Sequence, residues 1–302
     1  MEQPVHLQRL RDIIAILIVA LFMFPIAWWA LTSIKPMSAM FNKDKVVVFD
    51  FEPTSVNYRV VMLGQSRSEI AIESGSTFGV GGSSSYDSRR TILDSLLIAI
   101  GSTTLTTLIA MLASYALSRM SFRGRDSYLN WVLGQRFMPP IAIIVPLVTM
   151  YKTVGMRDTD NLYLGYVGLI LMHALINLPI AILLMKSFFD DVPKDVDEAA
   201  MIDGATRWQT FGKVVMPMVR GGMAATAVLC FIFSWTEFLL SLFLTTTIRT
   251  VPVKITTFVT STGSEWGFIS ALGTAAIVPG FIFILLVQKH LVRGLTLGSL
   301  KE

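Results

Sequence analysis

Six apolar runs of helix length constrain this chain more than any other feature of its sequence. A run of about 20 apolar residues crosses the hydrocarbon of a bilayer as a helix. None of these runs alternates apolar and polar residues as the strands of a membrane barrel do. We therefore predict an all-α membrane protein with six transmembrane helices, at Ile13–Ile34, Ile92–Leu117, Tyr128–Tyr151, Leu162–Met185, Gly222–Thr245 and Ile269–Val292.

The low charge of the chain supports a membrane protein, and the order of the apolar runs divides it into four parts. Charged residues make up only 15% of it, against roughly 25% in soluble domains. The first run is too long and too rich in Phe and Trp for a cleaved signal peptide, so it is predicted to stay as a helix. The predicted parts are an N-terminal tail with the first helix (1–34), an extracytoplasmic loop (35–90), a core (91–292) and a cytoplasmic tail (293–302).

Basic residues indicate the orientation in the bilayer. Lys and Arg gather on the segments before the first run, between the second and third, between the fourth and fifth, and after the sixth. The short loops on the other side hold few of them. Because cytoplasmic loops carry an excess of Lys and Arg, both termini are predicted to be cytoplasmic. The Gly/Ser-rich segment around Gly79–Ser85 is then outside.

One polar block interrupts the apolar runs on the predicted cytoplasmic side, "DEAAMIDGATRWQTFGKVVMP" at 197–217. It predicts a helix, a tight turn and a second helix. Pro193 suits a first helical turn, with Asp190 and Asp191 as candidate caps. Gly204 suits a left-handed stop, and Thr206 begins a Thr-x-x-Gln capping box.

The residues beside the predicted turn are small. Ala199, Ala200 and Ala205 would let another backbone approach closely, and Glu198 offers a carboxylate to a partner's Arg. One interpretation is a knob that docks in another protein. The other is an ordinary amphipathic helix that lies in the membrane interface.

The block resembles the EAA loop of the permease subunits of bacterial ATP-binding-cassette importers. That pattern is matched by the spacing of Glu198-Ala199-Ala200, Gly204, Val214, Met216 and Pro217. The resemblance extends from Ser95 to the C-terminus. The stretches "SYALSRMSFRGR", "MPPIAIIVPL", "FSWTEFL" and "LVRGLTLGSLKE" look like the carbohydrate branch, in particular the shorter permease of a maltose-type pair.

The resemblance implies a type I importer permease fold in the bacterial cytoplasmic (inner) membrane, with a coupling helix between helices 4 and 5 in the loop 188–217. It implies coupling to the ATPase through Glu198, Ala199, Ala200, Asp203, Gly204 and Pro217. The implied partners are a second, homologous permease, two copies of a cytoplasmic ATPase and an extracytoplasmic sugar-binding protein. It implies no nucleic acid, and the C-terminal tail resembles tails that reach the ATPases.

The sequence contains no G-x-x-x-x-G-K-[ST] phosphate-binding loop. The chain is therefore not expected to hold ATP by that chemistry. The resemblance implies a transporter subunit that is no enzyme and binds no cofactor, with ATP and Mg held by a partner ATPase.

Five polar or aromatic residues within the apolar runs are candidates for a translocation pathway, namely Arg136, His173, Asn177, Trp235 and Glu237. Arg136 faces either a cavity or the inner headgroups. His173 and Asn177 share a helix face, which indicates interhelical hydrogen bonding more often than a ligand site. Glu237 is predicted in the outer half, at a depth that does not match Arg136, so no ion pair between them is predicted.

The predicted function is that of a sugar importer permease, with one alternative in the same importer class and two in other classes. One is a permease for a solute other than a sugar, and another is a carrier or channel that needs no ATPase. A third is an intramembrane enzyme, which requires an acid and a base at one depth. No such pair is predicted from the sequence.

Overall fold

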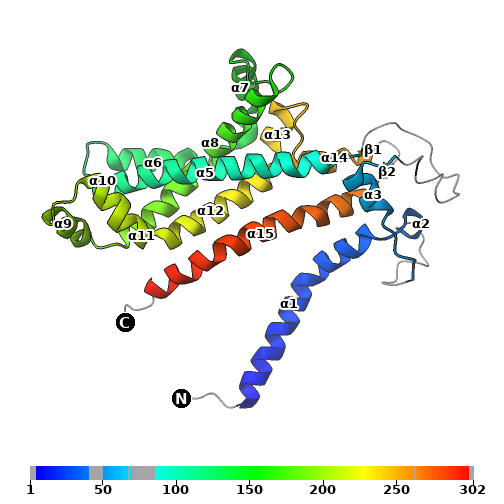
Figure 1. Cartoon of the computed structure of the whole chain (residues 1–302), viewed down its shortest axis with the longest axis horizontal. Helices are drawn as coiled ribbons and strands as arrows, with labels where there is room; N and C mark the ends of the chain where they lie inside the picture. The colour runs from blue at the N-terminus through cyan, green and yellow to red at the C-terminus, as the bar shows by residue number, and fades with distance from the viewer. Residues whose placement is uncertain are drawn as a thin grey trace. The chain divides into compact units, whose positions relative to one another are not determined.

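The structure is a computed structural model that describes residues 5–40, 50–66, 69, 86–135, 137–260 and 263–298. Regular structure in these ranges is almost entirely helical (Figure 1). The helices are α1 (Val5–Ser33), α2 (Met37–Met40), α3 (Val56–Leu63), α5 (Arg89–Arg119), α6 (Arg125–Gln135), α7 (Pro140–Thr153), α8 (Leu162–Asp190), α9 (Lys194–Ile202), α10 (Arg207–Gln209), the π-helix η2 (Thr210–Val215), α11 (Met216–Met218), α12 (Arg220–Trp235), α13 (Leu239–Leu244), α14 (Val251–Thr256) and α15 (Trp266–Gly298). A two-stranded antiparallel hairpin joins β1 (Val259–Thr260) to β2 (Gly263–Ser264).

The described helices fit the predicted all-α membrane fold. Four of them are long and apolar enough to cross a membrane, at Gln8–Ser33, Arg89–Arg119, Leu162–Asp190 and Trp266–Gln288. Two further pairs, α6 with α7 and Arg207–Met218 with α12, pass the same test together, although they bend by 95° and 75°. Counting each bent pair as one span gives six.

Two of the predicted spans are broken helices. Pro140 is the first residue of α7, because a proline there lacks the N–H that would continue the helix from α6. The prediction of one unbroken helix over Gly222–Thr245 is wrong, since α12 ends at Trp235 and α13 begins at Leu239. The carboxylate of Glu237 lies at this second break and accepts the N–H groups of Leu240 and Ser241 in the new helix.

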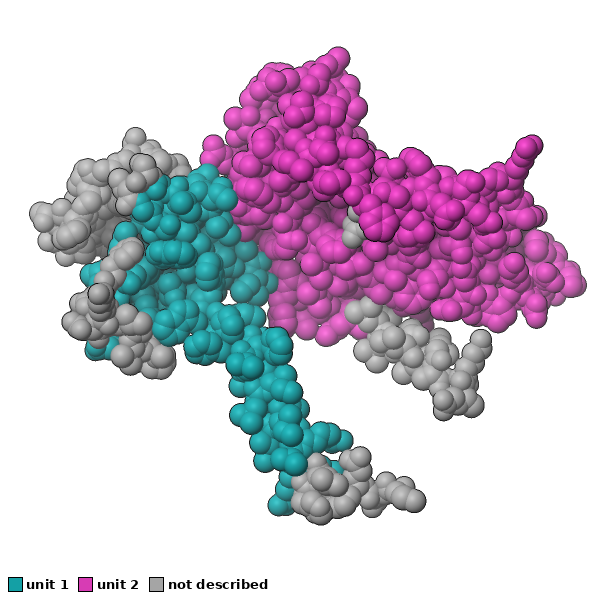
Figure 2. Space-filling view, turned by 180° about the vertical axis from the view of Figure 1, so that it is seen from behind, with its two compact units in different colours: residues 1–90, 254–277 teal, residues 91–253, 278–302 magenta. Residues whose placement is uncertain are grey.

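The described chain divides into two compact units, which Figure 2 colours separately. The first comprises residues 1–90 and 254–277, and the second comprises 91–253 and 278–302. Buried side chains hold the first unit together. The Asn57 amide donates to the carbonyl oxygens of Ser33 and Lys35 at 2.8 and 3.0 Å, which ties α3 to the end of α1.

An ion pair lies at the surface of the first unit, just before α5. The Arg89 guanidinium lies 2.7 Å from the Asp87 carboxylate. Its hydrogen bonds hold the pKa of the Asp87 carboxyl below its usual value. The pair keeps the start of α5 anchored to the preceding loop.

In the second unit, α8 packs along α12, and α5 contacts both helices. Ser114 on α5 donates to the carbonyl oxygen of Ile182 on α8 at 2.7 Å, as hydroxyls do between transmembrane helices. Gly222 on α12 lies so close to the Phe188 ring of α8 that a Cβ atom would clash with it. These contacts bring the three helices together and position the loop between α8 and α12.

Candidate functional site

The EAA loop, residues 188–217, runs from the last residues of α8 into the short helix α9. Pro193 is the N-cap of α9 and not part of its first turn as predicted, and Asp195 and Asp197 lie in that turn, where the helix dipole favours negative charge. The prediction that Asp190 or Asp191 caps this helix is wrong. Asp190 is the last residue of α8, and its carboxylate accepts from Ser118 and Lys186 instead.

The turn after α9 has the predicted form. Gly204 takes a left-handed conformation with φ of +87°, which a residue with a Cβ atom adopts only with strain. The N–H groups of Gly204 and Ala205 donate to the carbonyl oxygens of Met201 and Ala200, the two bonds of a Schellman motif. Thr206 and Gln209 then form the predicted capping box, with reciprocal bonds of 3.3 and 2.8 Å.

The residues of the EAA motif face outwards. Of the six predicted coupling residues, Ala200 is half-buried, and the others are exposed, namely Glu198, Ala199, Asp203, Gly204 and Pro217. The structure adds two apolar side chains beside them that our sequence reasoning missed. Ile202 is 86% exposed and Trp208 is 73% exposed. The sequence signal for this exposed surface was the presence of two large apolar residues in an otherwise polar block.

The opposite side of α9 is buried against α5. The Arg119 Nε lies 3.0 Å from an Asp197 oxygen, and the two side chains are only 7% and 8% exposed. The Tyr115 hydroxyl donates to the other Asp197 oxygen at 3.0 Å. The sequence analysis assigned no partner to Asp197, and the structure gives it two, Arg119 and Tyr115.

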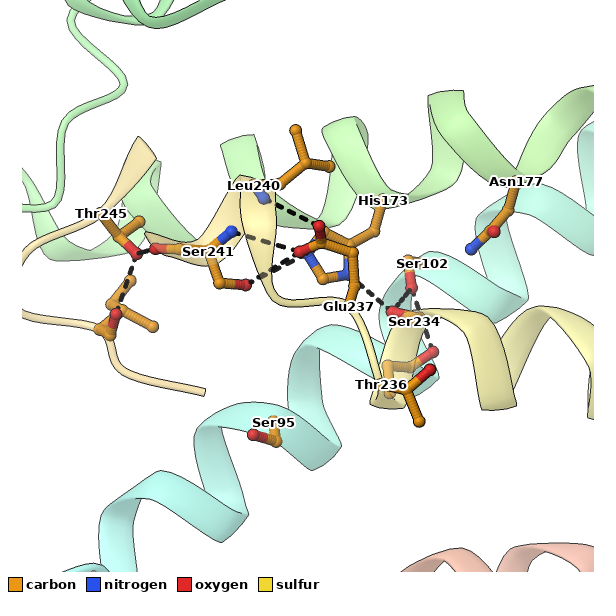
Figure 3. A network of polar contacts seen from close by, with 12 residues as sticks. Ser95, Ser102, His173, Asn177, Ser234, Thr236, Glu237, Leu240, Ser241 and Thr245 are labelled. Carbon is orange, nitrogen blue, oxygen red and sulfur yellow. Dashed lines mark hydrogen bonds and ion pairs between the residues drawn. The ribbon is translucent and has the colours of Figure 1, made fainter. Parts of the chain in front are cut away.

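A second group of polar residues lies inside the helix bundle, where α12 gives way to α13 (Figure 3). The Glu237 carboxylate accepts the backbone N–H of Leu240 at 2.8 Å and of Ser241 at 3.3 Å. It also lies 3.3 Å from Nε2 of His173 on α8. The predicted pathway residues Glu237 and His173 are therefore direct partners.

The rest of this polar group links three helices. The Ser234 hydroxyl on α12 lies 2.8 Å from His173 Nδ1 and 2.8 Å from the Ser102 hydroxyl on α5. Asn177 donates to the carbonyl oxygen of Cys230 at 3.5 Å. The interpretation of His173 and Asn177 as interhelical hydrogen-bonding residues agrees with these contacts.

Most of the sequence that carries these two arrangements matches a known family of transport proteins. A family model described as "Binding-protein-dependent transport system inner membrane component" matches residues 106–297. The chain belongs to this family. We refer to it below as the permease.

Relatives cover nearly the whole permease. It is 34% identical over 284 residues to the probable ABC transporter permease protein y4oR of Sinorhizobium fredii, covering 93% of this chain and 91% of that one. It is 32% identical to the sulfoquinovosyl glycerol transport system permease protein SmoH of Agrobacterium fabrum, covering 97% and 93%. It is 31% identical to the trehalose transport system permease protein SugB of Mycobacterium tuberculosis, covering 94% of each.

A solved structure shares the fold. A chain of a bacterial ABC transporter involved in the import of the acidic polysaccharide alginate superposes with a TM-score of 0.67 at 18% identity, covering 96% of the permease and 99% of that chain. The predicted importer permease fold is confirmed, and the permease is a multi-pass membrane protein and a transporter subunit.

The remaining pathway candidates have separate surroundings. The Trp235 ring stacks on Phe231 with 5.6 Å between the ring centroids. Arg136 lies outside the described residues, as does the predicted outer segment Gly79–Ser85. A mainly apolar cavity of about 520 Å³ lies between α6, α7 and α8, with Trp131 and Gln135 in its lining.

The structure corrects the statement that no acid and base share one depth, because His173 and Glu237 are in contact. Their surroundings are nevertheless those of a packing contact. The His173 side chain is fully buried, and Ser234 and Ser241 are only 4% and 1% exposed. A substrate reaches these hydroxyls only if the helices separate. Among the described residues, no group of three or more His, Cys, Asp or Glu side chains is placed to hold a metal ion.

Proposed function

We propose that the permease forms half of the translocation pathway of an ATP-driven sugar importer and is driven through its EAA loop. The observation that carries the proposal is the exposed surface of that loop. Ile202 and Trp208 expose large apolar side chains next to the exposed Glu198. Apolar residues rimmed by polar ones are typical of a protein–protein contact.

The proposed partner at this surface is a cytoplasmic ATPase subunit. Ile202 and Trp208 would fill an apolar groove on it, Glu198 would pair with a basic residue, and Gly204 with Ala199 would allow close backbone approach. ATP and Mg would be held by the ATPase, because the permease sequence has no phosphate-binding loop. We further propose two ATPase copies, one second homologous permease, an extracytoplasmic binding protein, and both termini in the cytoplasm.

The proposed substrate is a sugar or glycoside. Two of the relatives that match nearly the whole permease are named for the transport of trehalose and of sulfoquinovosyl glycerol. A solute of another class is the alternative within the same importer family. If the chain were a carrier or channel that needs no ATPase, the exposed EAA surface would have no partner.

One reconstitution tests these alternatives. The permease is co-expressed with its genomic neighbours, purified through a tag on the permease, and placed in liposomes. We expect an ATPase subunit to co-purify and its hydrolysis to rise when the binding protein is loaded with a sugar from a panel. Stimulation by a non-sugar solute alone would move the permease to the other substrate class. A homogeneous oligomer without any ATPase subunit would contradict the importer assignment.

A further inference from the structure

The exposed side of the EAA loop indicates where a partner binds. The buried side indicates which membrane helix the loop moves. Along the chain, the loop is joined to α8 and α12, and its buried polar contacts also lead to the end of α5. We propose that Arg119 and Asp197 fasten the EAA loop to α5, so that a movement imposed on the loop is passed directly to that helix. This inference rests on the proposed function, because it requires an ATPase that moves the loop.

The first support is the geometry of the Asp197 carboxylate. Arg119 Nε lies 3.0 Å from one of its oxygens in an ion pair that lacks hydrogen-bond geometry, and the Tyr115 hydroxyl donates to the other at 3.0 Å. Both partners lie in the last two turns of α5, and both charged side chains are buried. Separating such a pair leaves an uncompensated buried charge, so the contact resists being pulled apart.

The same end of α5 also contacts the loop ahead of α9. A second nitrogen of Arg119 donates to the carbonyl oxygen of Val192 at 2.9 Å. The neighbouring Ser118 donates to the Asp190 carboxylate at the end of α8, at 2.6 Å. One turn of α5 therefore holds the entrance of the loop as well as its first helix.

Aromatic packing extends the contact to the second half of the loop. The Tyr115 ring lies 5.6 Å from that of Phe189 and 4.8 Å from that of Phe211, measured between centroids. Phe211 belongs to the π-helix and is itself 6.1 Å from the exposed Trp208. Tyr115 thus touches the segments before and after α9 while it bonds to α9.

The covalent connection from the loop to α12 is bent. It passes through the π-helix Thr210–Val215 and then bends by 75° before α12. Helix breaks and π-helical turns are positions where a helix changes direction. A loop fastened to α5 but joined to α12 through such a bend moves α5 with it and lets α12 follow at an angle.

Substitution of the pair tests the inference in the complete importer. Arg119→Gln and Asp197→Asn each remove one charge; Asn matches Asp in size, and Gln keeps the first three side-chain carbons of Arg. We expect the ATPase subunit to remain bound and to hydrolyse ATP, while the amount of solute imported per ATP falls about tenfold, within the usual range of coupling between sites. Arg123→Gln is the matched control, because the Arg123 side chain is exposed beyond the end of α5, and it should behave as wild type.

Distance measurements test the same inference without altering the pair. Spin labels are placed at the exposed positions Asp195 on α9, Leu112 on α5 and Ile232 on α12, with Cys230 replaced by Ser. Between the nucleotide-free and ATP-trapped importer, we expect the distance from Asp195 to Leu112 to stay constant and that from Asp195 to Ile232 to change.

Several results would overturn the inference. The first is an unchanged import per ATP in both variants of the pair. The second is a change in the distance from Asp195 to Leu112 as large as that from Asp195 to Ile232. The third is a wild-type permease that retains no ATPase subunit, which removes the proposed function as well. If only the Arg119 and Asp197 variants import less solute per ATP and both still bind the ATPase, the defect lies in passing movement to α5. If they lose the ATPase, the defect lies in its binding to the EAA loop, and the inference fails.

Discussion

Nε2 of His173 lies 3.3 Å from a carboxylate oxygen of Glu237, within the helix bundle. The contact joins α8 to the break between α12 and α13. The same carboxylate accepts the first free N–H groups of α13, from Leu240 and Ser241. Glu237 therefore ends one helix segment, begins the next and fastens the break to a neighbouring helix.

Replacing Glu237 should destabilise the permease more than replacing its neighbour. Glu237→Ala removes the acceptor of two backbone N–H groups and the partner of His173. Each buried polar group left without a partner costs about 1–3 kcal/mol, so we expect the purified variant to melt several degrees below wild type. Thr236→Ala is the control, because the Thr236 hydroxyl is exposed and only bonds to its own helix.

A double-mutant cycle separates the contribution of the His173–Glu237 contact from that of the hydrogen bonds that Glu237 accepts from α13. If His173 and Glu237 are coupled, the double Ala variant should lose less stability than the sum of the two single variants. Strict additivity of the three melting shifts would contradict a direct contact between the two side chains.

The sequence predicted the EAA loop well, since its geometry depends on neighbouring residues. The left-handed Gly204 and the capping box of Thr206 each involve bonds within a few positions of the chain. The predicted cap by Asp190 failed because Ser118, which lies far away in the sequence, binds that carboxylate. A local pattern cannot reveal a competitor from another helix.

The contacts between helices could not be predicted for a similar reason. We predicted an unbroken fifth helix and compared the depth of Glu237 with that of Arg136 along it. The break after Trp235 turns Glu237 towards α8, where it contacts His173. The pairing of Arg119 with Asp197 likewise depends on how α5 packs against the loop, which no periodicity in either segment specifies.

The exposed apolar residues of the EAA loop should control how tightly the ATPase binds. Ile202→Ser and Trp208→Ser each remove an apolar side chain whose burial stabilises a contact by about 1.5–3 kcal/mol. We expect roughly tenfold or greater loss of ATPase affinity for each, measured by titrating the purified ATPase against the permease in nanodiscs.

Tyr163→Ser provides the control for this titration. Tyr163 is 82% exposed at the start of α8, whereas the EAA loop follows the end of that helix. Its replacement should leave ATPase binding unchanged. If the Ile202 and Trp208 variants also bind normally but partition less into lipid, α9 is an interfacial helix and not a docking element.

The orientation of the permease can be measured with single cysteines. The native Cys230 is buried and should not react. We expect a cysteine at Ser84 to react with an impermeant thiol reagent in intact spheroplasts, and a cysteine at the exposed Asp195 to react only after lysis. The reverse labelling pattern would place the termini and the EAA loop outside.

Glu198 and Gly204 should be required for coupling but not for membrane insertion. Glu198→Lys reverses the charge offered to the ATPase, where a charge-assisted hydrogen bond contributes about 1.5–3 kcal/mol. Gly204→Asp adds a side chain at a left-handed position, which costs about 1–2 kcal/mol of backbone strain, and it projects into the proposed contact. We expect both variants to reach the membrane at wild-type levels and to lose solute uptake.

Two controls separate the docking contact from backbone strain at Gly204. Gly124 is also left-handed, with φ of +91°, and nothing lies within 4 Å of a Cβ atom built there. Gly124→Asp should therefore carry similar strain and keep its uptake. Gly204→Asn tolerates the left-handed conformation better but still adds bulk, so it should lose uptake as Gly204→Asp does. Inserted protein, retained ATPase subunit and uptake are measured together in each variant. Near wild-type uptake in both Glu198→Lys and Gly204→Asp would show that the EAA loop is not the coupling element.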